Sequence, residues 1–152
     1  MAAPSLRKVP DTSSLLPRTY IVFYDGECGL CQRSVRWLLD HDPYQRLAFA
    51  PLQGRTAARL RAQHVPLPAQ LESVALLVQS DPRPQVFLRT RAFLELCRIL
   101  EVDPWWARLL HYVPVNLADI AYRILARLRY RLFGRATACP WRTPEEAQRF
   151  LE

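Results

Sequence analysis

The chain has 152 residues, of which 50% are hydrophobic and 23% charged, and a formal net charge of +7. This length suits one domain, and the apolar fraction argues against a disordered or collagen-like chain. No apolar stretch reaches the roughly 18 residues of a membrane-spanning helix, and no secretion signal is evident at the start. We therefore expect a cytoplasmic protein in which the four cysteines are not permanent disulfides.

The predicted elements alternate between strand and helix. Residues 1–18, which contain three prolines, are predicted to form a flexible tail. After the tail, apolar and β-branched runs predict strands, and apolar residues at helical spacing predict helices. The predicted strands are 20–24, 47–50, 74–78 and 85–88, and the predicted helices are 30–39, 54–63, 91–100 (with Thr90 as N-cap), 103–113 and 116–133.

This order predicts an α/β fold, a small mixed sheet with helices on both faces. The strands and first three helices would form a core over residues 19–102. The remaining residues, 103–152, would form a helical C-terminal extension packed on that core.

The most informative stretch is Cys28-x-x-Cys31, directly after the first strand and at the start of a helix. Free backbone N–H groups and the helix dipole at this position stabilise a negatively charged sulfur. Cys28 would therefore be the attacking thiolate, and Cys31, one helical turn on, would resolve the mixed disulfide. We expect Cys28 to be exposed at the sharp turn formed by Asp25 and Gly26. The negative charges of Asp25 and Glu27 oppose a thiolate at Cys28. We therefore expect the cysteine pair to be a reducing or neutral redox couple rather than a strong oxidant.

Other interpretations of these residues remain open. Asp25 either is a turn residue that caps the start of the helix, which we favour, or accepts the proton of Cys31 during resolution. The cysteine pair could instead be buried and structural, or could hold zinc with distant ligands, but zinc sites normally need tighter spacing. The remaining candidate ligands are isolated in sequence: Cys97, Cys139, His41, His64 and His111. Cys97 fits a buried helix position, and Cys139 is interpreted as a spectator.

The stretch Asp25-Gly26-Glu27-Cys28-Gly29-Leu30-Cys31 resembles the DCC family of thiol-disulfide oxidoreductases, named for its Asp and two Cys. Further similarity extends over about residues 19–142. It includes the stretch from Leu47 to Gln53, which resembles the family's second strand and the Gln after it, Thr90-Arg91-Ala92, and the Arg-rich helix from Tyr122 to Arg129. The resemblance implies a thioredoxin-like fold with a four-stranded sheet.

The chain departs from the thioredoxin-like pattern at one position. Such redox proteins usually place a cis-proline just before the third strand, facing the cysteine pair, whereas this chain has Ser73 there. We predict that Gly29, Leu30 and Ser73 contact the substrate. The substrate would be a protein or small-molecule disulfide, with an external thiol or reductase as electron donor. No cofactor is expected, because the chain has no glycine-rich nucleotide motif.

The last long helix is rich in arginine. Arg123, Arg127 and Arg131 recur at four-residue spacing, beside an apolar stripe of Ile120, Ile124, Leu128 and Leu132. The simplest interpretation is that the stripe packs on the domain and the basic face is solvated. Alternatively, the basic face of helix 120–135 binds a partner, either a membrane surface or an acidic protein. The chain has no nucleic-acid-binding motif beside these arginines, so we do not expect a nucleic acid as partner.

The sequence therefore predicts a thiol-disulfide oxidoreductase. The competing hypothesis is a non-enzymatic protein whose cysteine pair is structural or binds metal, and which contacts an acidic partner through the basic helix. Trp105, Trp106 and Trp141 could line a substrate groove, but we predict that they anchor the C-terminal helices in the core.

Overall fold

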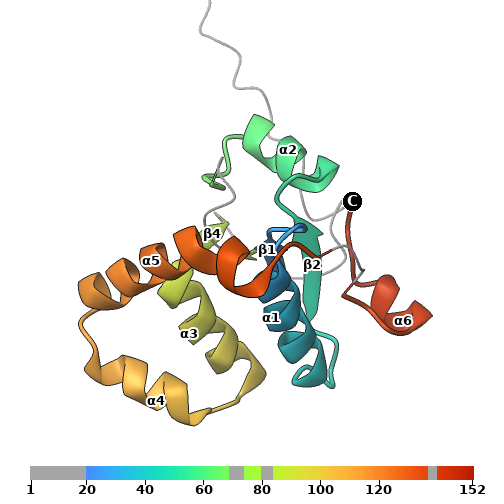
Figure 1. Ribbon diagram of the computed structural model, residues 1–152. Coiled ribbons are helices and arrows are strands. Elements are labelled where there is room, and N and C mark those ends of the chain that lie inside the picture. Colours follow the sequence, from blue (N-terminus) through green and yellow to red (C-terminus); the bar gives the residue numbers. More distant parts are fainter. Residues whose placement is uncertain (1–19, 69–73, 80–83, 137–139) are drawn as a thin grey trace, which may run out of the picture.

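The structure is a computed structural model that describes residues 20–68, 74–79, 84–136 and 140–152 (Figure 1). The elements follow one another in the order β1 (Tyr20–Tyr24), α1 (Gly29–Asp40), β2 (Leu47–Pro51), α2 (Arg55–Ala62), β3 (Ala75–Val78), β4 (Gln85–Leu88), α3 (Arg89–Leu100), α4 (Trp105–Tyr112), α5 (Val115–Phe133) and α6 (Pro144–Ala147).

The four strands form one mixed sheet in the order β2-β1-β3-β4. β1 runs parallel to β2, with Val22 opposite Phe49, and antiparallel to β3, with Val22 opposite Leu76. β3 and β4 form an antiparallel hairpin. This topology confirms the predicted α/β fold, a thioredoxin-like sheet whose parallel pair is joined through α1, as a parallel pair requires.

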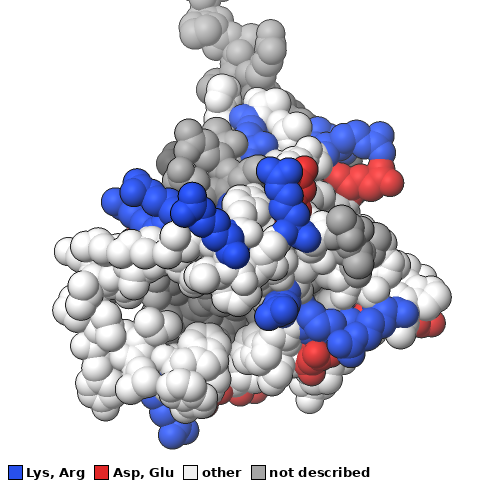
Figure 2. All heavy atoms as spheres, in the orientation of Figure 1, with Lys and Arg blue, Asp and Glu red and all other residues white. Residues whose placement is uncertain are grey.

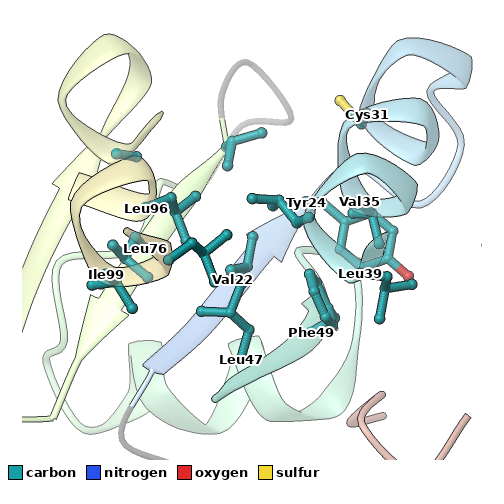
Figure 3. Packing of buried hydrophobic residues seen from close by; sticks show 14 of the residues in the cluster. Val22, Tyr24, Cys31, Val35, Leu39, Leu47, Phe49, Leu76, Leu96 and Ile99 are labelled. Atoms are coloured by element: carbon teal, nitrogen blue, oxygen red, sulfur yellow. The ribbon is translucent and has the colours of Figure 1, made fainter. Parts of the chain in front are cut away.

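Successive residues of β1 point to opposite faces of the sheet and build two hydrophobic cores. Val22 and Tyr24 pack with α1 and α3 on one face, and Figure 3 shows this cluster around Val22, Phe49 and Leu96. Ile21 and Phe23 pack with α2 on the other face. Both faces of β1 are covered, which explains why its sequence is a continuous apolar run.

The C-terminal part of the chain lies against two regions of this core. α5 contacts α1 and α3, on the same side of the sheet. The last residues return to β2, where the N–H of Phe49 donates to Arg149 (2.9 Å) and that of Leu151 donates to Phe49 (2.7 Å). The chain end therefore covers the outer edge of β2.

Two details differ from the sequence-based expectations. Thr90 lies inside α3, and the N-cap is Leu88, because the hairpin strand passes directly into the helix. The short helix α6 was not predicted; Thr143 caps it by accepting a hydrogen bond from the Glu146 N–H, with Pro144 in its first turn. The predicted tail 1–18 lies outside the described residues.

Candidate functional site

The two cysteines lie where β1 passes into α1. Cys28 is the N-cap of α1, and its sulfur accepts a hydrogen bond of 3.4 Å from the backbone N–H of Cys31. A sulfur atom here takes the capping role usually played by a Ser or Asp oxygen. The helix start thus directs an N–H donor at the first cysteine of the pair.

Both sulfurs are buried, so the expectation of an exposed Cys28 is wrong. Cys28 is 0% exposed and Cys31 is 5% exposed. The segment that follows α5 covers the turn: Cys28 forms a β-bridge with Arg135, and the Gly29 N–H donates to Gly134 (3.3 Å). The sequence could not reveal this cover, because it comes from more than 100 residues further along the chain.

The Cys31 thiol has a strongly perturbed pKa. Burial, the nearby Cys28 sulfur and a hydrogen bond with it together raise the pKa of Cys31 to about 12. The positive charge of Arg129 and a hydrogen bond with the backbone of Asp25 act in the opposite direction. Cys31 therefore holds its proton beside Cys28 at neutral pH.

Asp25 is buried beside the pair and is fully engaged by other groups. Its Oδ1 accepts from the Glu27 N–H and from the Gln53 side-chain amide, both at 2.9 Å. Its Oδ2 forms an ion pair of 3.0 Å with Arg129 and accepts the hydroxyl of Tyr130. The prediction that Asp25 caps the helix start is wrong, because Cys28 is the N-cap of α1. Asp25 instead caps the turn before the helix through the Glu27 N–H, and the same side chain ties α5 to the cysteine turn.

Sequence reasoning did not single out Arg129 and Tyr130. Arg129 is one of many arginines in α5, but its side chain is only 5% exposed, whereas Arg123 and Arg127 are exposed. Position gave a partial signal: Arg129 is seven residues after Tyr122 and shares its helix face, away from the four-residue arginine row, but spacing does not say which face packs. Burial and the hydrogen bond with Asp25 raise the pKa of Tyr130, which keeps its hydroxyl as a donor.

An apolar pocket of about 360 Å³, lined in large part by α5, reaches Cys31. Cys31 and Arg129 lie among its lining residues, together with Leu30. The rest of the lining comes from α1, α3, α4, α5 and the residue before β3, and consists of Ser34, Val74, Thr90, Phe93, Trp106, Leu110, Ala118, Ala121, Tyr122, Leu125 and Ala126. Figure 3 shows the Cys31 sulfur pointing away from the core side chains Val22 and Phe49. The pocket thus reaches the second cysteine, and not the first.

The other predicted site residues fall in different places. Gly29 lies against the backbone of residues 133–134 and borders a separate, more polar hollow with Arg33 and Arg135. Ser73 and Cys139 lie outside the described residues. Cys97 is buried, on α3. Within the described part of the chain, no group of His, Cys, Asp and Glu side chains is placed to hold a metal ion.

Of the three tryptophans predicted to anchor the C-terminal helices, two pack against other aromatic rings and one is exposed. Trp106 is half-buried, lines the pocket and meets Trp37 edge-on at 5.9 Å between ring centroids. Trp141 packs on Phe150. Trp105, in contrast, is 73% exposed, so its predicted place in the core is wrong.

Comparison with known proteins identifies a family whose model covers the cysteine pair and most of the chain. The family model of DCC1-like thiol-disulfide oxidoreductases matches residues 22–135, which include both cysteines, Asp25 and Arg129. The chain belongs to the DCC1-like thiol-disulfide oxidoreductase family. The expected family resemblance is thereby confirmed, and it supports a redox role with thiol or disulfide substrates.

Two curated relatives cover most of the chain. A DCC family protein of Arabidopsis thaliana, named as chloroplastic, is 29% identical over 86% of this chain and 76% of its own length. The uncharacterized protein YuxK of Bacillus subtilis is also 29% identical, over 92% of this chain and 98% of its own. No solved structure gives a significant match. Among the described residues, no helix is long and apolar enough to cross a membrane.

Proposed function

We propose that this chain catalyses thiol–disulfide exchange, with Cys28 as the attacking sulfur and Cys31 as the resolving sulfur. The observation that carries the proposal is the hydrogen bond of 3.4 Å from the Cys31 N–H to the Cys28 sulfur at the start of α1. A donor in this position stabilises a sulfur that carries negative charge, the form that attacks disulfides. The raised pKa of Cys31 keeps the second thiol protonated during that attack.

The reaction has two displacement steps. The Cys28 thiolate attacks one sulfur of the substrate disulfide, forming a mixed disulfide and releasing the other substrate sulfur as a thiolate. Cys31 then loses its proton, and its sulfur attacks Cys28, forming the Cys28–Cys31 disulfide and releasing the second substrate thiol. The substrate gains the two electrons that the pair loses, and an external thiol or reductase returns the pair to the dithiol.

Asp25 is the proposed proton acceptor for Cys31, and one of its present donors, such as the Tyr130 hydroxyl, must release the carboxylate for this step. Its carboxylate is buried beside the pair, and its backbone hydrogen bond with Cys31 places the two residues next to each other. Arg129 holds this carboxylate by its ion pair of 3.0 Å and lowers the pKa of Cys31 by its charge. The charge of Arg129 thus favours the deprotonation of Cys31 that resolution requires, and the ion pair fixes the position of the Asp25 carboxylate.

The pocket indicates the class of substrate. It is lined mainly by apolar side chains and reaches Cys31, so it suits a disulfide that carries an apolar group. Leu30 would contact that group. Because Cys28 is covered by residues 134–136, attack requires that this segment moves away from the turn. Gly29, under the same segment, would become a contact of the bound substrate.

A reducing compartment suits this reaction, because it regenerates the dithiol. We place the chain in the cytoplasm, as its sequence predicts, while the Arabidopsis relative is named as chloroplastic.

The burial of both sulfurs favours a second candidate function, a non-enzymatic role in which the pair is structural. Buried thiols without a route to solvent are inert, and Cys28 is 0% exposed. Thiol reactivity of the folded protein separates the two candidates.

The decisive experiment measures reduction of a small aromatic disulfide by the folded chain, with a thiol as electron donor. We expect turnover by the wild type and loss of turnover in Cys28→Ser, and Cys31→Ser should accumulate a mixed disulfide at Cys28 that mass spectrometry identifies. Cys97→Ser is the matched control, since it removes a buried thiol on α3 and should keep activity. Equal rates for the wild type and the Cys28→Ser variant would establish the structural role instead.

A further inference from the structure

α5 presents three different faces. One face packs on the domain through Ala118, Tyr122 and Arg129. A second face is a row of large apolar side chains that point to solvent, each between 40% and 64% exposed. This apolar stripe consists of Leu117, Ile120, Ile124, Leu128 and Leu132. The expectation that Ile120, Ile124, Leu128 and Leu132 pack on the domain is therefore wrong, because α5 uses the next face of the helix for packing.

α4 continues the exposed apolar character. Trp105, Leu109 and Tyr112 follow one another at helical spacing and are 73%, 56% and 88% exposed. Such a set of large apolar side chains on two consecutive helices is more than scattered surface hydrophobicity and marks an interaction site.

The third face of α5 is basic. Arg123, Arg127 and Arg131 are exposed and occupy the helix face next to the apolar stripe. The one acidic residue of α5 is Asp119, which forms an ion pair of 3.9 Å with Arg89. Figure 2 shows basic side chains gathered along α5, beside the uncharged surface over α4 and α5. The surface thus combines exposed apolar groups with unbalanced positive charge.

We infer that the faces of α4 and α5 dock on an anionic lipid surface. A helix with an apolar face, an arginine row beside it and neighbouring Trp and Tyr side chains has the composition of an interfacial membrane helix. The apolar stripe would enter the headgroup region while the arginines contact lipid phosphates. A second copy fits poorly, since symmetric pairing through α5 would bring two arginine rows together. A nucleic acid offers no partner for the apolar stripe.

This inference is independent of the redox proposal and goes beyond it. No described helix is suited to span a membrane, so the association would be peripheral. It would place α4 and α5, which contribute residues to the pocket that reaches Cys31, at the lipid surface.

The test is co-sedimentation of the full chain with vesicles of phosphatidylcholine alone and of phosphatidylcholine containing phosphatidylglycerol. We expect binding to the anionic vesicles only, weakened by added salt. Removing two charges in Arg123→Gln/Arg127→Gln should weaken binding about 30-fold, whereas Arg59→Gln/Arg91→Gln, which removes two exposed arginines elsewhere, should change it little. Ile124→Ser should weaken binding about tenfold, with Tyr44→Ser, another exposed large side chain, as control.

Failure to bind anionic vesicles would overturn the inference, as would equal losses in the paired and control variants. A dimer detected by light scattering and dissolved by Ile124→Ser would assign the surface to a second copy instead. Circular dichroism verifies that each variant is folded. All four substituted arginines and both substituted apolar residues are exposed in the free chain, which separates a binding defect from unfolding.

Discussion

Two buried Asp–Arg ion pairs hold the C-terminal part of this chain to its sheet, at two different sites. Asp25 and Arg129 join the end of β1 to α5, with side chains 1% and 5% exposed. Asp42 and Arg149 join the segment before β2 to the chain end, with side chains 0% and 4% exposed. In both pairs, a carboxylate from the first third of the chain meets an arginine more than 100 residues later.

The groups around the two pairs differ. Asp42 accepts from the N–H groups of Arg46 (3.0 Å) and Leu47 (2.9 Å), and Arg149 donates to the Leu47 carbonyl (3.1 Å). All these partners are backbone, so this pair fixes the start of β2. Asp25 and Arg129 instead lie beside two thiols and a pocket. The same ion pair chemistry therefore serves structure at one site and can influence sulfur chemistry at the other.

The largest expected effect is the loss of either arginine. Arg129→Ala and Arg149→Ala each leave a buried carboxylate without its ionic partner, which should cost about 3–5 kcal/mol of unfolding free energy. Denaturant titration of each variant measures the loss. Only Arg129→Ala should also slow alkylation of Cys31, because the charge of Arg129 lowers the pKa of that thiol.

Arg129→Lys and Arg149→Lys are the matched controls, since each keeps the positive charge. Arg129→Lys should recover most of the Cys31 alkylation rate. An equal effect of both alanine variants on Cys31 would contradict the division of roles between the two pairs.

The second prediction compares the glycines beneath the two C-terminal contacts. A Cβ at Gly29 would lie 2.5 Å from the Phe133 carbonyl oxygen, so Gly29→Ala must push the 133–136 segment away. A Cβ at Gly54 would meet Pro51 and the backbone of Glu152 at 3.0 Å, a milder conflict. We expect Gly29→Ala to cost about 1–3 kcal/mol and Gly54→Ala less, by denaturant titration.

Thiol labelling sharpens this comparison. Because the displaced segment covers Cys28, Gly29→Ala should increase the labelling rate of Cys28 in the folded protein, and Gly54→Ala should leave it unchanged. An unchanged rate in Gly29→Ala would mean that residues 133–136 do not control access to Cys28.

The sequence predicted the local features of this site better than its long-range ones. The buried run of β1, the turn at Asp25 and the cysteine pair at the start of α1 follow from spacing and residue type, and all are present. The burial of Cys28 and the Arg129 partner depend on how α5 crosses α1, which spacing alone does not determine. The same limit applies to the apolar stripe of α5, since either of two adjacent helix faces could have packed.

The third prediction concerns the titration of Cys31 near the first ion pair. Two of the causes that raise its pKa to about 12 come from Cys28, so Cys28→Ser should lower this pKa and speed Cys31 alkylation about tenfold per pKa unit. Mass spectrometry across a pH series measures it, and Cys97 serves as an internal control. The unfolded thiol ionises near its ordinary value of 9.0, so stability should fall as pH rises from 9.0 toward 12. A pH-independent stability across this range would contradict the assignment.

The smallest effect is expected at the surface ion pair that ties α6, near the chain end, to α1. Arg36 pairs with Glu146 at 2.6 Å, and hydrogen bonds from Arg36 and from the Arg142 N–H lower the pKa of Glu146 to about 2. The lowered pKa means that this contribution is present above pH 4.5 and is lost as pH falls toward 2. Because the pair lies near the surface, Glu146→Gln should cost only about 0.2–1 kcal/mol at neutral pH, less in high salt. A loss as large as that of Arg149→Ala would show that α6, rather than the buried Asp42 pair, anchors the chain end to β2.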